Sequence, residues 1–455
     1  MIRKLLKVIK ENNIKKIDSL LVLSFISGLF LFFESVRLYS SNQLLEPRLP
    51  LWLNVLLFLS CVISFVVYLT IEYYKKLNKR QVFFLFVLLF LIFSQLSSIV
   101  ATNNSFTILI TKQDNMLLPI TFKSTFNNQL IHFFAITFIL ISYYIGFIII
   151  PYKIRNIKLI IFLIHIYYLV ATVFLIYSLF TDDYIGYFKL YTEGTIDLQF
   201  LQYYVPHGFF GNKNTYAMFV EVGIFLGLLN FELTKKKYHI VISVLFYLHL
   251  VFLICKVGIL FSTITLFAYL IYKLFYSIKK GDKKTLITLI SVLGAFVIAI
   301  TILIITTPLF KYMMSFINND HSFDERIKIW QLSLDITKQT SLINGAGFGL
   351  FNYYLYVATE ASGITPTPIA HSWFYSILGR GGIILLTAYI LVLLYSIFIA
   401  TKLYMKNAKI TLVLLLAEIT FFCHSFFEDN HYIAILITIA FVIFNKIYSY
   451  KEQLL

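Results

Sequence analysis

Charged residues are scarce in this sequence. Only 13% of its 455 residues are charged and 59% are apolar, whereas an average globular chain carries about 25% charged residues. This composition excludes a soluble enzyme and a soluble binding module. Cysteine is scarce as well, and its spacing fits neither a disulfide framework nor a metal site. The three cysteines are Cys61, Cys255 and Cys423.

Long apolar runs take up most of the chain. Many of them reach the roughly 20 residues that an α-helix needs to cross a bilayer, and they lack the ten-residue alternation of a β-barrel. We therefore predict an all-α, polytopic transmembrane bundle that forms one integral membrane domain over residues 1–455, with about twelve spans. The expected spans are 19–36, 51–71, 82–100, 130–150, 159–180, 215–231, 238–254, 257–276, 286–305, 382–400, 410–427 and 432–444.

Acidic residues are the scarcer charge, at 22 against 38 lysines and arginines, which gives a net charge of +16. The basic residues concentrate in every second connection between spans, as the positive-inside rule predicts. We therefore expect both termini in the cytoplasm and no nucleic-acid partner. The basic connections begin near residues 75, 153, 235, 279 and 402.

The longest polar interruption is a predicted extracytoplasmic loop, residues 307–371, before the tenth span. Ser322 and Glu325 form a capping-box pattern ahead of an amphipathic helix, which puts Arg326 near the helix start. A cation there opposes the helix dipole, and two explanations remain open. Either an anion binds beside Arg326, or Asp324 and Glu325 form a local salt bridge with it.

The same loop ends at His371. Pro366 and Pro368 make its approach stiff and non-helical, and a helix is expected just beyond. A lone histidine is more often structural than catalytic, yet it is the side chain best suited to act as a general base near neutral pH. The glycines of residues 345–349 precede neither a Lys-Ser nor a Lys-Thr pair, so they predict a turn and not a phosphate-binding loop.

The connection before the sixth span ends in a glycine-rich stretch at a helix start. Exposed backbone amides and the helix dipole favour an anion there, although an ordinary glycine turn with an asparagine cap explains the same residues. The side chains that could bind a substrate are His207, Asn212, Lys213 and Asn214.

Other polar residues stand at or near the ends of apolar helices. Lys256 occupies a helix–helix turn on the outer side, as a lysine that reaches toward water or as an anion ligand. Glu221 and Glu418 lie within helices, where they are either structural pairs or functional groups. A last outward turn gathers more such side chains, and a cap-and-turn role explains them best. They are His424, Glu428, Asp429 and His431.

In order and spacing, several of these segments resemble the O-antigen ligase and Wzy polymerase superfamily. The stretch G-F-F-G-N-K-N-T-Y-A is similar to the superfamily's G-x-F-G-N-x-N-x-x-A segment, and the later segments resemble its long periplasmic loop and following helix. The resemblance covers residues 205–445. Its segments are 208–217, 326–330, 345–349, 370–373 and 381–384.

The resemblance implies an enzyme, a glycosyltransferase that needs no metal or other cofactor and acts on undecaprenyl-diphosphate-linked sugars. Arg326 would hold the diphosphate, and His371 would be the base for the acceptor hydroxyl. Lys256 stands where the family usually has arginine; it keeps the charge and loses the bidentate fork. The family's His-Asn pair appears here as His371-Ser372, and His207 stands near the place of a missing arginine.

We therefore expect a polymerase that joins lipid-linked repeat units into a capsule, exopolysaccharide or O-antigen chain at the outer face of the bacterial plasma membrane. A ligase of the same superfamily is the alternative, and a lipid-linked oligosaccharide transporter or flippase is the alternative of another class. The expected partners are the undecaprenyl-diphosphate-linked glycan donor and acceptor and membrane lipid, with a chain-length regulator as a further candidate.

Overall fold

The computed structural model describes residues 213–284 and 321–428 with short gaps at 254 and 405–407, the strands at 106–111 and 117–122, and isolated helical positions within 59–93, 169–195 and 286–298. Most expected spans before residue 213, the span at 286–305 and the last span lie largely or wholly outside the described residues. The prediction of about twelve spans therefore stays a prediction.

Five described helices correspond to spans expected from the sequence. Three of the described helices are long and apolar enough to cross a membrane, over Lys256–Lys280, Trp373–Leu391 and Lys409–Phe427. The expected turn at residues 255 and 256 is confirmed, because one helix ends at Phe252 and the next begins at Lys256. The five helices are α10 (Lys213–Thr234), α11 (Tyr238–Phe252), α12 (Lys256–Lys280), α17 (Trp373–Tyr404) and α18 (Ala408–Phe427).

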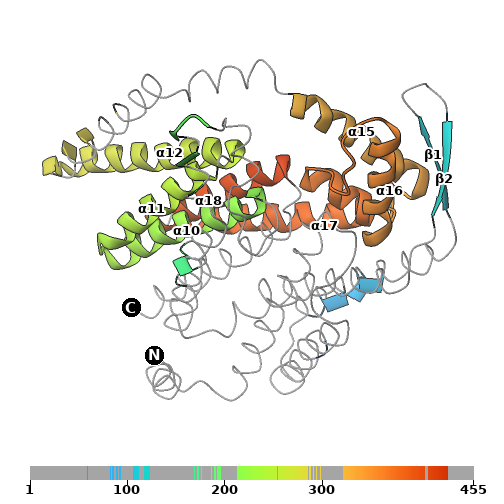
Figure 1. The fold of residues 1–455 in the computed structure, drawn as a ribbon. Helices are drawn as coiled ribbons and strands as arrows, with labels where there is room; N and C mark the ends of the chain where they lie inside the picture. Colours follow the sequence, from blue (N-terminus) through green and yellow to red (C-terminus); the bar gives the residue numbers. More distant parts are fainter. Residues whose placement is uncertain are drawn as a thin grey trace.

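Helix α10 contacts three other helices of this bundle, α11, α12 and α18 (Figure 1). Residues 220–230 of α10 are all buried. Gly223 and Gly227 bring α11 close, because a Cβ at Gly223 would lie 2.9 Å from the Phe246 ring and one at Gly227 would collide with Ser243. Small residues at a crossing let two helices approach closely in this way.

The basic connections of the described bundle gather at one end. Lys409, at the start of α18, lies 4.2 Å from the centroid of the Tyr276 ring near the end of α12. At the end of α10, the buried Glu232 accepts a hydrogen bond from Lys235 at 2.5 Å and pairs with Lys273 of α12. The opposite end of α10 carries Asn214, roughly 27 Å away along the helix axis.

The predicted outer loop contributes two further helices, α15 (His321–Thr340) and α16 (Phe348–Ala361). They pack together and against α17, and bury a core from Ile329 and Ile336 of α15 to Phe351 and Tyr354 of α16. The amphipathic helix around Arg326 is thus confirmed. The N-cap prediction for Ser322 is wrong, because α15 already includes His321.

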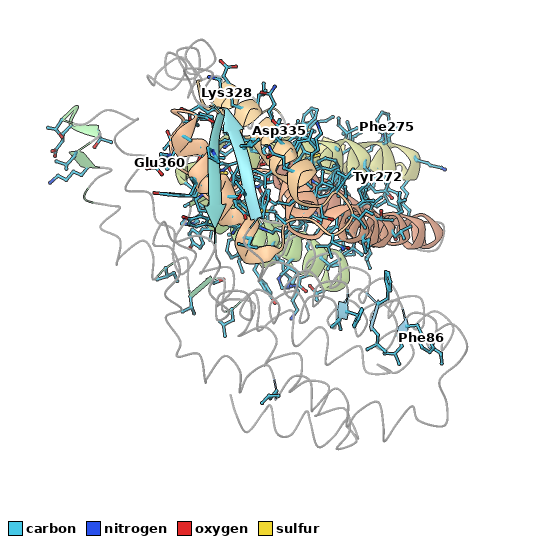
Figure 2. All side chains as sticks on the ribbon, turned by 90° about the vertical axis from the view of Figure 1, so that its right-hand side faces the viewer. Phe86, Tyr272, Phe275, Lys328, Asp335 and Glu360 are labelled. Atoms are coloured by element: carbon cyan, nitrogen blue, oxygen red, sulfur yellow. The ribbon has the colours of Figure 1, made fainter. Side chains whose placement is uncertain are left out.

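A two-stranded antiparallel hairpin is the feature that the all-α prediction omitted. Its strands are β1 (Phe106–Thr111) and β2 (Leu117–Phe122), and β1 contacts α15 and α16 (Figure 2). The Gln339 side chain of α15 donates to the Leu109 carbonyl at 2.9 Å and accepts from the Leu109 amide at 2.8 Å. Leu109 is opposite Pro119 in the register, so its backbone groups face Gln339 instead of β2.

The glycine turn of residues 345–347 fills a break in α17. At Gly382 the α17 backbone leaves the helical region, with φ 64° and ψ −165°. Backbone hydrogen bonds join the two segments, from Ala346 to the Gly379 carbonyl (2.7 Å) and from Ile383 to the Leu342 carbonyl (3.0 Å). Backbone groups that a broken helix frees within a membrane protein must find such partners, so the glycine motif serves packing, as a turn.

We predict that Gly382→Ala destabilises the protein far more than Gly281→Ala. Both glycines have a positive φ, +64° and +66°, but a Cβ at Gly281 meets nothing within 4 Å, whereas one at Gly382 would overlap the Ile343 carbonyl. Gly281→Ala should therefore cost about 1–2 kcal/mol, and Gly382→Ala several times that. Thermal unfolding of the detergent-purified variants measures both, and equal losses would contradict the packing role.

Candidate active site

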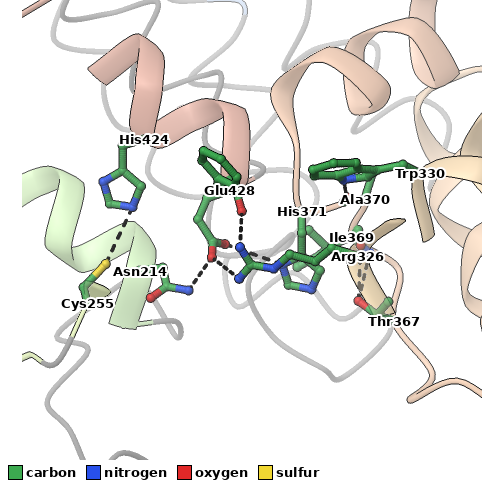
Figure 3. Close-up of polar contacts among 11 residues, drawn as sticks. Asn214, Cys255, Arg326, Trp330, Thr367, Ile369, Ala370, His371, His424 and Glu428 are labelled. Carbon is green, nitrogen blue, oxygen red and sulfur yellow. Dashed lines mark hydrogen bonds and ion pairs between the residues drawn. The ribbon is translucent and has the colours of Figure 1, made fainter. Parts of the chain in front are cut away.

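Arg326 points from the second turn of α15 to the end of α18. Its Nη1 donates to the Phe427 carbonyl at 3.1 Å, and its Nη2 donates to Glu428 Oε1 at 3.1 Å (Figure 3). The ion pair of Arg326 is thus with Glu428 and not with its sequence neighbours Asp324 and Glu325. The local salt-bridge explanation is wrong.

Trp330, one turn further along α15, fixes the residue before His371. Its indole Nε1 donates to the Ala370 carbonyl at 3.0 Å. The indole ring stacks on Tyr375 of α17, with centroids 5.4 Å apart and planes at 15°, and meets Phe426 of α18 edge-on at 6.2 Å. One aromatic side chain therefore joins α15 to both α17 and α18 beside the Arg326 contact.

His371 lies at the end of a stiff segment, two residues before α17 begins at Trp373. The Thr359 hydroxyl of α16 accepts a hydrogen bond from the Thr367 amide at 3.0 Å, which ties this segment to α16. His371 itself has φ 48°, a left-handed conformation that non-glycine residues seldom adopt. Residues held in such conformations cluster at functional sites, where the surrounding structure imposes them.

Glu428 joins these side chains. Its Oε1 accepts from Arg326 and also from Asn214 Nδ2, at 2.5 Å, and its Oε2 lies 3.5 Å from His371 Nδ1. Four segments thus meet at one carboxylate: the first turn of α10, α15, the residues before α17 and the end of α18. We call Asn214, Arg326, His371 and Glu428 the Glu428 cluster (Figure 3).

The Glu428 cluster keeps its carboxylate charged. Glu428 is 2% exposed, and this burial by itself raises the pKa of the carboxyl. The hydrogen bond with His371 and the charges of Arg326, His371 and His424 outweigh burial and lower the pKa to about 2. Ionised Glu428 can accept a hydrogen bond from the Nδ1–H of neutral His371, and in that tautomer the Nε2 lone pair is available to a ligand.

The residues expected at the site divide into three groups. Arg326, His371 and Asn214 come together, from three separate segments. Lys213 and Lys256 are the first residues of α10 and α12; the Lys256 side chain is exposed, and its role in binding stays a prediction. His207 and Asn212, and the neighbours Asp429 and His431 of the last turn, lie outside the described residues.

Sequence reasoning missed Glu428 as the centre of the site and assigned it to a cap or turn. A usable signal was present, because two expected cations on one face of the membrane require a buried counter-charge. Glu428 is an acid directly after an apolar helix on that face. Its partners are 57 to 214 residues away in sequence, so no local pattern identifies them.

Comparison with models of known protein families finds none that matches this chain, and comparison with curated proteins finds no match either. The interpretation of the site therefore depends on its own geometry and on the resemblance of the sequence segments.

We predict that acid removes a stability increment that Glu428 provides. Its pKa falls from 4.5 to about 2 on folding, so the increment is complete above pH 4.5 and is lost as the pH falls toward 2. Its size is about 3 kcal/mol. Thermal unfolding against pH should show a steeper acid loss for the wild type than for Glu428→Gln.

Glu360→Gln is the matched control, because Glu360 is exposed on α16. It should leave the acid loss of the wild type unchanged. Identical acid profiles for the wild type and Glu428→Gln would show that Glu428 is not held charged by the cluster.

Proposed function

We propose that this protein is a glycosyltransferase that joins undecaprenyl-diphosphate-linked repeat units into a surface polysaccharide. The single observation that carries the proposal is the Glu428 cluster. A guanidinium suited to a diphosphate and an imidazole suited to a sugar hydroxyl share one carboxylate at one end of an apolar bundle. Leaving-group stabilisation and proton removal are the two tasks that such a transfer requires.

Arg326 would stabilise the leaving group. A guanidinium has five N–H donors in a planar fork, and two of them bind the Phe427 carbonyl and Glu428. The other donors suit the oxygens of a diphosphate, which gains charge as its bond to the anomeric carbon breaks. Glu428 balances the guanidinium when no donor is bound, so the charge of the partly buried Arg326 is compensated in that state as well.

His371 would activate the acceptor. With Nδ1 directed at Glu428, Nε2 would accept the proton of the acceptor sugar hydroxyl as its oxygen attacks the anomeric carbon. The new C–O bond forms as the bond to the diphosphate breaks, and His371 then releases its proton to water. The role of Glu428 is to hold the imidazole in the tautomer and orientation that this step needs.

The place of the cluster in the bundle suits a membrane-embedded substrate. The cluster lies at the end of the bundle opposite Glu232, Lys273 and Lys409. By the positive-inside rule that lysine-rich end is cytoplasmic, and the Glu428 cluster would then face outward, where undecaprenyl-linked sugars are polymerised or transferred.

The break in α17 does not favour a transporter. In transporters, broken helices near the middle of the membrane line a substrate cavity. Here the backbone of residues 342–347 occupies the break at Gly382, and the polar cluster lies at one end. A ligase of the same superfamily remains the alternative outcome of the test.

The proposed reaction can be reconstituted from purified components. Purified protein in lipid vesicles, supplied with an undecaprenyl-diphosphate-linked repeat unit, should yield a ladder of chains with increasing numbers of repeats. Transfer of one glycan to a separate acceptor without a ladder would support the ligase. No transfer to any acceptor would contradict the proposed function. His371→Ala should lower the turnover by about 10²- to 10⁴-fold without loss of folded protein.

A charge-conserving substitution tests the role of the Arg326 guanidinium. Arg326→Lys keeps the charge and loses the fork that reaches both the Phe427 carbonyl and Glu428, so turnover should fall by about 10- to 100-fold. Lys328→Arg is the matched control, since Lys328 is exposed two residues along the same helix (Figure 2) and should retain full turnover. Equal turnover of Arg326→Lys and the wild type would exclude Arg326 as the diphosphate ligand.

A further inference from the structure

A second polar group lies deeper in the bundle, between α10, α12 and α18. Glu221 Oε1 is 2.7 Å from His424 Nδ1, and both side chains are fully buried. His424 Nε2 is 3.6 Å from Cys255 Sγ, and Cys255 is the residue directly before α12. One imidazole therefore links the carboxylate of α10 to the thiol that precedes α12.

The backbone leaves room for this pair. A Cβ at Gly258 would lie 2.6 Å from Glu221 Oε1 and 3.3 Å from His424 Cε1, so any side chain at Gly258 would displace one of them. Glu221 Oε2 is buried and has no hydrogen-bond partner among the described residues. A carboxylate kept for bundle stability alone would gain from a second donor, since an unsatisfied buried acceptor is costly.

The pair spans the same boundary as the Asn214–Glu428 contact. Glu221 follows Asn214 by two helical turns on α10, and His424 of α18 precedes Glu428, the residue directly after α18, by four residues. Residues at these spacings lie on one face of a helix. The contacts Asn214–Glu428 and Glu221–His424 are therefore two successive links across the same α10–α18 boundary.

We propose that the Glu221–His424 pair is a positioning element for the Glu428 cluster. It holds α10 and α18 in the register in which Asn214 and Glu428 meet, and through Cys255 it also places the start of α12, where Lys256 lies. Neither Glu221 nor His424 needs to touch a substrate for this role. Its importance for turnover depends on the proposed function, whereas its effect on the cluster does not.

The primary test uses the acid-dependent stability increment of Glu428, the difference in unfolding stability between the wild type and Glu428→Gln as the pH is lowered. Thermal unfolding of the detergent-purified full chain gives this increment. In each of three backgrounds, with Glu221 unchanged, Glu221→Asp or Glu221→Gln, the protein with Glu428 is compared with its Glu428→Gln counterpart. If the pair positions Glu428, the increment should shrink to roughly half or less in both variant backgrounds.

The two variants separate position from charge. Glu221→Asp keeps the negative charge and moves the carboxylate by one methylene, so only position changes. Glu221→Gln also removes the negative charge that pairs with His424, and so alters the charge that His424 presents to Glu428; its increment combines position and charge, and the Asp background isolates position. An unchanged or larger increment in the Asp background would overturn the proposal.

Thr420→Val is the matched control. Thr420 and Thr265 form a buried 2.8 Å hydrogen bond between α18 and α12, one turn deeper than His424. Removing that hydroxyl should lower the overall stability and leave the Glu428 increment intact. A similar loss of the increment in Thr420→Val would show that any weakening of the bundle has this effect, and would overturn the positioning role.

Turnover provides an independent second readout. With the glycan donor, Glu221→Asp should lose roughly 100-fold in kcat, the scale of a small misplacement in an active site. Thr420→Val should stay within about twofold of the wild type. If the wild type forms no glycan product, the proposed function fails, while the stability increments still decide the positioning role.

Discussion

The carboxylate of Glu428 is buried at the end of α18, and such a charge is tolerated only with opposite charges and hydrogen-bond donors around it. Asn214 donates from α10, Arg326 from α15, and His371 approaches from the segment before α17. No two of these donors are neighbours in sequence. The requirement to compensate one carboxylate therefore couples the folding of the outer segment to that of the bundle.

Two further contacts make that coupling rigid. The indole of Trp330 binds the Ala370 carbonyl and stacks on Tyr375, so α15 fixes the backbone next to His371. The glycine turn at 345–347, directly before α16, forms hydrogen bonds with the backbone of α17 near its break. These bonds fix the start of α16 against α17. As a result, the cation and the imidazole are both held by elements with their own buried core, as a preorganised site requires.

Much of the described bundle was predictable from the sequence. The apolar runs locate α10, α11, α12 and α18 within a few residues, because hydrophobic length and basic connections are properties of each segment alone. The helix expected just beyond His371 is confirmed, because α17 begins at Trp373, whereas the membrane span was predicted to begin nine residues later, at Gly382, where the structure has a break inside the helix. The hairpin was missed, although residues 106–111 carry threonines and β-branched residues typical of strands.

The candidate site was only partly predictable. The sequence by itself determined the apolar bundle, the segregation of lysines to one set of connections, and the placement of Arg326 and His371 in one polar loop. Only the tertiary structure decided that Glu428 is their common partner, that Asn214 joins them, and that Arg326 turns away from Asp324 and Glu325. The physical reason is that these contacts span 57 to 214 residues, and helix packing, which no local pattern encodes, brings them within hydrogen-bond distance.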